Sequence, residues 1–197
     1  GVVMDIERRK LLKQQAKTQA AEEAAAMAQR EADRDEALWK LIRDHLARAT
    51  PEQRHMYVAS SNYDDNERGI RFLADLPDLE QGTAVMLFWL KGADALARLT
   101  PSEMASYQED EWELIKLIEQ RVVNGFYRTG TIRFDPANCP LYPGEYASLG
   151  PLVHPIAPQM YAITEGDTYV NVEVIREKYD EGLPEDVAAA VWAQWNE

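Results

Sequence analysis

The sequence predicts a mainly α-helical fold, in which a helical body surrounds a buried central helix. A long N-terminal helical arm and a small β element toward the C-terminus are expected beside it. Residues 4–48 contain no glycine or proline, which favours one long helix, with or without a break. Residues 78–92 (DLEQGTAVMLFWLKG) have a centre that is apolar on every side of a helix. Residues 169–175 (YVNVEVI) alternate as a half-buried strand does, and they supply the expected β element.

The apolar stretch in the middle of the chain is predicted to be the central helix. Asp78 and Gln81 have the spacing of a capping box, and Lys91 and Gly92 provide a cationic last turn and a C′ glycine. A helix that is apolar all round is normally buried, with other elements packed about it. Gly82 weakens the prediction, because glycine inside a helix costs about 1 kcal/mol relative to alanine. A fully buried strand is the alternative for so short a run.

The chain is expected to divide into an arm, residues 1–34, and a mainly helical domain, residues 35–197. The arm has few large apolar side chains, so it is either a solvated helix or a weak coiled-coil partner. A helical apolar stripe then marks the start of the domain, formed by Leu38, Leu41, Ile42 and Leu46.

Two capping signals predict further helices. Thr50, followed by Pro51 and Gln53, opens a short helix, and another helix is expected at residues 67–76. Thr100, followed by Pro101 and Glu103, is expected to open a helix that runs to residue 124. The predicted core members of that helix are Trp112, Ile115, Leu117, Ile118 and Val122.

The period of the sequence changes after Gly125, which suits the C′ position of the preceding helix. A short β hairpin is expected around Thr129-Gly130, and residues 135–158, rich in proline and glycine, are expected to be irregular. A last helix is predicted to begin at Pro184. It carries Trp192 and Trp195, for which a clamp against the core is favoured over an exposed apolar patch.

Composition limits the class of function. The net charge of -13 argues against direct nucleic-acid binding and agrees with a basic protein partner, although solubility alone would also explain it. No stretch approaches the roughly 20 apolar residues of a membrane span. Early charges at Asp5 and Glu7 argue against a signal peptide, and a lone cysteine, Cys139, agrees with a reducing compartment. The chain is therefore expected in the cytoplasm.

No pattern points to catalysis, a cofactor or a metal. Cys139 lies in a proline-rich loop without a nucleophile motif, and no GxSxG, P-loop or GxGxxG sequence occurs. The histidines lack partners at the spacing of a zinc site; they are His45, His55 and His154. We therefore expect no enzyme, no cofactor and no metal site.

An acidic loop at residues 64–69 is similar to a calcium loop only in part. Arg68 falls where an oxygen ligand is required, so capping of the next helix by Asp64 to Asn66 is the preferred interpretation. A second acidic cluster surrounds Trp112 on a predicted helix, and it either faces a basic partner or is a solvated face with the tryptophan turned inward. Its members are Glu109, Asp110, Glu111 and Glu113.

Two sequence blocks resemble a bacterial family of domains of unknown function. They are SNYDDN at residues 61–66 and DLEQGTAVMLFWL at residues 78–90. A third block, GFYRTGTIRFDP at residues 125–136, is similar to a later part of the family, so the resemblance covers Ser60 to Pro136. Such domains are associated with the immunity proteins of bacterial polymorphic toxins.

This resemblance implies a non-enzymatic protein that neutralises a cognate toxin by occlusion. A basic nuclease is one such toxin. The implied contacts are Tyr63, Asp64, Asp65 and Glu67 in the loop and Glu109, Asp110 and Glu113 on the helix. The alternative is a structural or scaffold protein, a homo-oligomer assembled through residues 4–34. An enzyme ranks third, because no motif pairs the many carboxylates with a nucleophile or metal.

Overall fold

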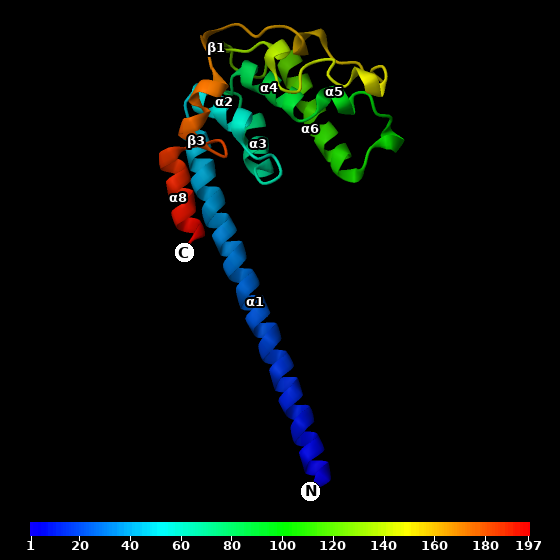
Figure 1. Ribbon diagram of the computed structural model, residues 1–197, viewed down its shortest axis with the longest axis vertical. Helices are drawn as coiled ribbons and strands as arrows, with labels where there is room; N and C mark the ends of the chain where they lie inside the picture. Colours follow the sequence, from blue (N-terminus) through cyan, green and yellow to red (C-terminus); the bar gives the residue numbers. More distant parts are fainter.

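The structure is a computed structural model that describes all 197 residues. It confirms the mainly α fold: a helical body carries one long projecting helix and two small β elements (Figure 1). None of the helices is both long and apolar enough to cross a lipid bilayer. The helices are α1 (Val2–Arg48), α2 (Pro51–Ser60), α3 (Glu67–Ala74), α4 (Gln81–Leu90), α5 (Ala93–Leu96), α6 (Ser106–Val123), α7 (Val172–Ile175) and α8 (Glu185–Trp195). The strands are β1 (Gly130–Arg133), β2 (Gly166–Tyr169), β3 (Tyr179–Asp180) and β4 (Leu183–Pro184).

The predicted N-terminal helix is confirmed as the single unbroken helix α1. Its 47 residues span about 70 Å, at about 1.5 Å per residue. Every residue from 1 to 33 is exposed, and contact with the body begins at Arg34, where α8 lies alongside (Figure 1). The exposure therefore changes next to the expected boundary at residue 34, while the division into two domains stays a prediction.

The predicted central helix is confirmed as α4, which is buried on every side from Gly82 to Trp89. It packs against α2, α6 and β1, and its side chains lie in one core cluster of 25 buried residues. The predicted cap is wrong: α4 begins after Glu80, and the Asp78 carboxylate instead lies 3.2 Å from the buried Arg54 guanidinium. Gly92 adopts φ +96°, as expected for a glycine that ends a helix.

Lys91, predicted as part of a cationic last turn, is the C-cap residue of α4 and is buried. Its side chain is only 3% exposed, and its Nζ lies 2.8 Å from Glu67 and 3.8 Å from Glu111. A buried ammonium group requires such partners, because an unpaired charge in the interior is strongly destabilising. Lys91 therefore ties the end of α4 to the start of α3 and to α6.

The two capping signals have different outcomes. Thr50 and Gln53 form the predicted capping box at the start of α2. Thr100 and Glu103 also form one, but it opens only a 3₁₀ turn at residues 101–103, and α6 begins separately at Ser106. Within α6, Ile115, Ile118 and Val122 are buried as predicted, and Trp112 packs against the core while only partly buried. Leu117 is exposed, and Leu114 is buried in its place.

The predicted β hairpin at residues 126–134 is wrong. Strand β1 pairs in parallel with β2, and Gly130 lies opposite Gly166. The predicted strand at residues 169–175 is also wrong, because β2 ends at Tyr169 and residues 172–175 form the single turn α7. The Asn171 side chain caps that turn, and Val172 and Ile175, one helical turn apart, pack against the cluster around Met56. Residues 135–158 contain only short 3₁₀ turns, as expected.

Three buried carboxylates, one just before α4 and the others on α5 and α6, attach the C-terminal half of the chain to the body. Glu80 accepts the backbone N–H groups of Thr131 and Ile132, both at 2.8 Å. Asp94 accepts those of Gly144 and Tyr146, at 2.8 and 2.7 Å. The third, Glu119, accepts the N–H of Ala157 at 2.9 Å and pairs with Lys116. Charge-assisted hydrogen bonds to the backbone thus add to the short β1–β2 ladder in holding this half of the chain on the body.

A candidate protein-binding cleft

A cleft of about 640 Å³ opens between the base of α1, the loop before α3, the β3–β4 hairpin and α8; we call it the α1–α8 cleft. Its apolar lining is Leu38, Ile42, Leu183, Ala188 and Val191, together with Trp39, Trp192 and Trp195. Its carboxylates are Asp35, Asp65, Asp180 and Glu181, and its one cation is Arg68. The cleft therefore combines aromatic and aliphatic contact area with an excess of negative charge.

The two helices form the cleft because their apolar residues recur at helical spacing. On α8, Ala188, Val191, Trp192 and Trp195 follow the pattern i, i+3, i+4, i+7, which places them on one face. Leu38 and Ile42 are four apart on α1 and face the same space. The helices lie side by side near the C-terminus of the chain (Figure 1).

The β3–β4 turn places two carboxylates at the rim. Glu181 and Gly182 both have positive φ, +47° and +86°, as in the type I′ turn of a two-residue hairpin. A non-glycine residue in this region costs roughly 1–2 kcal/mol, so the Glu181 conformation is held by its surroundings. Asn66 donates to the Glu181 carbonyl at 3.4 Å, and the Trp192 indole donates to Asp180 at 3.0 Å.

The clamp predicted for the two C-terminal tryptophans is present only in part. Trp192 remains 55% exposed and Trp195 45% exposed, although α8 packs on α1. Arg34 stacks 4.1 Å above the Trp195 ring, and Arg68 lies 4.7 Å above Trp39 while pairing with Glu36. Exposed aromatic side chains grouped in one concave surface are typical of a protein-binding site.

Only one residue of the predicted loop contacts lines this cleft, Asp65. Asp64 is exposed, whereas Tyr63 is turned inward and donates from its hydroxyl to the Val58 carbonyl at 2.7 Å. The carboxylate of Glu67 is occupied by Lys91 and Arg71. The capping interpretation of residues 64–66 is wrong, because α3 begins without any side-chain cap.

The predicted contacts on α6 lie elsewhere. Glu111 faces the body, because it pairs with Lys91. Glu109 and Glu113 each stand two residues from it, roughly 160–200° around the helix, and both are exposed on the opposite side. Asp110 is exposed as well. The structure therefore does not join the loop group and the α6 group into one surface. Trp112 is half-buried, 4.9 Å from the His154 ring.

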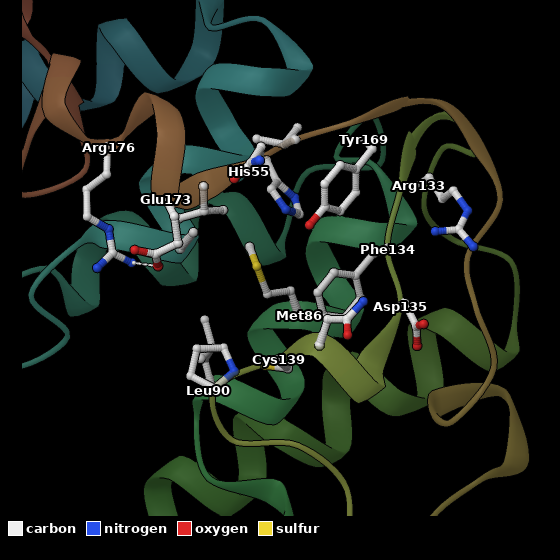
Figure 2. Close-up of a pocket in the computed structure, with 16 residues that line it drawn as sticks. His55, Met86, Leu90, Arg133, Phe134, Asp135, Cys139, Tyr169, Glu173 and Arg176 are labelled. Carbon is white, nitrogen blue, oxygen red and sulfur yellow. Dashed lines mark ion pairs between the residues drawn. The ribbon is translucent and has the colours of Figure 1, made fainter.

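A second, smaller pocket of about 140 Å³ lies between α2, α4 and the segments that follow β1 and β2 (Figure 2). His55, Met86, Phe134 and Cys139 line it, and the Glu173–Arg176 ion pair lies at one side. Burial lowers the pKa of His55 to about 4 and raises the pKa of Cys139 to about 11. At neutral pH the pocket thus holds a neutral imidazole and a thiol, without an activated nucleophile.

His55 makes the stability of the fold depend on pH. Its Nδ1 lies 2.7 Å from the Thr83 hydroxyl, and its folded pKa of about 4 is below the ordinary 6.5. The unfolded chain therefore binds the proton more tightly, and stability is lost as pH falls from about 6.5 to about 4. We expect this loss to be about 3 kcal/mol smaller in His55→Gln, measured by urea unfolding at both ends of the range. An equal loss in the two proteins would contradict the expectation.

No three side chains of the kind that bind metal ions converge anywhere in the chain. Sequence reasoning missed the cleft residues Asp180 and Glu181. The only local sign of the turn that carries them is the glycine that follows this acidic pair. Asp35 and Trp39 were also missed as site residues, although Trp39 adjoins the predicted stripe.

Comparison with known proteins places the resemblance on the helical body. No curated protein and no solved structure matches the chain. The block at residues 125–136 lies outside the family match, as do the arm, all four strands and α8. Residues 49–123, which run from α2 to the end of α6, match the family described as a domain of unknown function, DUF4274.

Proposed function

We propose that this protein is an immunity protein that binds a cognate bacterial toxin and neutralises it by occlusion in the cytoplasm. The observation that carries the proposal is the α1–α8 cleft, in which half-exposed tryptophans lie among carboxylates. Tryptophan is the residue most enriched at binding hot spots. The resemblance of residues 61–66 and 78–90 to a family associated with toxin immunity supports the same class of function.

The charge of the chain suits a basic partner, such as a nuclease whose substrate is a polyanion. Four carboxylates line the cleft, and its one cation, Arg68, is already paired with Glu36. A basic segment entering the cleft would gain attraction at long range, which speeds encounter, and would bury the tryptophans at short range. Occlusion follows when the bound chain covers the cationic surface that the toxin needs for its substrate.

The test is a binding measurement with the product of the adjacent gene, using the full chain. Trp192→Ala is expected to weaken binding by about 2 kcal/mol, or about 30-fold, because it removes an aromatic anchor. Tyr107→Ala is the matched control, since Tyr107 is 66% exposed on α6 and outside the cleft. Equal affinity for Trp192→Ala and the wild type would reject the cleft as the binding surface.

Charge reversal separates the two groups of predicted contacts. Asp65→Lys, in the cleft, is expected to slow association and reduce its salt dependence. Glu113→Lys, on the outward face of α6, tests the surface formed with Glu109 and Asp110. A loss confined to Glu113→Lys would move the contact to α6, and a toxin that stays active with excess of this chain would reject neutralisation.

The second candidate is a structural or scaffold protein that oligomerises through residues 4–34. The observation that favours it is the exposure of every residue from 4 to 33, none of which is buried against the rest of the chain. Deletion of residues 4–34 is expected to convert an oligomer into a monomer under this alternative.

A further inference from the structure

The arm, residues 1–34, exposes all of its large apolar side chains. Ile6, Leu11, Leu12 and Met27 are 44–58% exposed, and no part of the body reaches them (Figure 1). A helix that is not buried against its own domain gains most of its stability by packing elsewhere. The arm therefore presents an unpartnered surface, and its charges indicate what the partner is.

The charges of α1 are segregated along its length. Residues 8–17 contain five cations and no carboxylate, whereas residues 22–36 contain six carboxylates and two cations. The centres of the two segments are about 25 Å apart along the helix. This exceeds the Debye length of about 8 Å at physiological salt, so the segments do not neutralise each other within one helix. Among residues 1–33 the structure shows one ion pair, between Lys10 and Glu7 at 3.6 Å.

We propose that the arm pairs antiparallel with the arm of a second copy of this chain, centred near Ala20. In that arrangement the basic segment of each arm lies against the acidic segment of the other, and Leu12 approaches the region of Met27. Alanines at 20, 21 and 24–26 allow close approach at the centre. A parallel, in-register pair would instead place five cations against five. This inference does not depend on neutralisation; it gives the scaffold alternative a defined geometry.

The first test measures the mass of the full chain in solution by light scattering. We expect twice the chain mass of 22.4 kDa at low salt, with a shift toward the single mass as salt rises. Reversing the basic segment (Arg9→Glu, Lys13→Glu, Lys17→Glu) should give the single mass, as should reversing the acidic segment (Glu22→Lys, Glu23→Lys, Glu31→Lys). Combining all six changes should restore the doubled mass. A single mass for the wild type at low salt would overturn the proposal.

The second test determines the orientation by disulfide formation. Cys139 is 3% exposed, so cysteines introduced into the arm are the only accessible thiols. With Lys13→Cys and Met27→Cys made separately, neither variant should cross-link to itself, whereas their mixture should. Self-cross-linking of each variant would indicate a parallel pair and overturn the antiparallel arrangement. No arm variant changes a residue that lines the cleft, so a single mass for the wild type together with intact toxin binding rejects this inference alone.

Discussion

Replacing Trp89 with alanine is expected to lower the free energy of unfolding by about 3–5 kcal/mol, the usual range for deletion of a fully buried aromatic ring. Trp89 lies in the last turn of α4 and has no exposed surface. Its indole N–H donates to the Met160 carbonyl at 2.9 Å, and its ring meets the edges of Phe88 and Tyr161. The residue therefore joins the central helix to a segment 71 positions later in the chain. Urea unfolding of the full chain, followed by circular dichroism, measures the loss.

Two further variants separate the causes of that loss. Trp89→Phe keeps most of the apolar contact but leaves the buried Met160 carbonyl without a donor, at a cost of about 1–3 kcal/mol. Trp192→Ala removes the same side chain from a half-exposed position, so its effect should be much smaller. If Trp89→Ala destabilised no more than Trp192→Ala, α4 would not be the centre of the core.

The central helix could be predicted because its signal is local and its burial is complete. A run of residues that is apolar on every side needs no knowledge of its partners. Even the glycine that weakened the prediction has a reason in the structure: a Cβ on Gly82 would lie 2.8 Å from the carbonyl oxygen of Ile132. The run could not reveal the role of Asp78. Its carboxylate pairs with Arg54 on α2 instead of capping α4.

The β elements could not be predicted, because their partners are distant in sequence. Ile132 in β1 pairs with Thr168 in β2, and a Cβ on Gly166 would lie 2.5 Å from the Ile132 carbonyl carbon. Nothing in the nine residues around β1 indicates that pairing, so a local hairpin was the reasonable expectation. The strand predicted at residues 169–175 is wrong for a different reason. Val172 and Ile175 are three residues apart, a spacing that also suits one face of a helical turn.

The cleft was predictable in part. The Trp192 and Trp195 pair and the stripe from Leu38 are visible in the sequence, but their mutual approach depends on how α8 returns to α1. The turn at Glu181 carries a residue that hairpin rules disfavour at positive φ, so it gave no hairpin signal. The pattern of acidic residues on α6 could not show which of them face the body. Glu111 faces inward and pairs with Lys91, whereas Glu109, Asp110 and Glu113 are exposed.

Replacing Asp94 with alanine is the second change for which we expect a loss of about 3–5 kcal/mol. Asp94 is 1% exposed and accepts two backbone N–H groups from the irregular segment, those of Gly144 and Tyr146. It also lies 3.2 Å from Arg98, whose guanidinium donates to the Gly150 carbonyl at 2.6 Å. Without the carboxylate, two donors and one buried cation lose their partner. Urea unfolding measures the loss, and proteolysis within residues 140–150 should accelerate.

The companion variants show whether the buried charge or the backbone attachment matters more. Asp94→Asn keeps one acceptor oxygen but removes the charge, so its free energy of unfolding should lie between those of the wild type and Asp94→Ala. Arg98→Met alone leaves a carboxylate that still accepts two backbone N–H groups. It should therefore lower the free energy of unfolding by less than Asp94→Ala does. In the double variant Asp94→Ala, Arg98→Met the loss should be smaller than the sum of the single losses, because no unpaired guanidinium remains in the interior. Additive losses would mean that the two side chains act independently, and that Asp94 stabilises the irregular segment through its backbone hydrogen bonds alone.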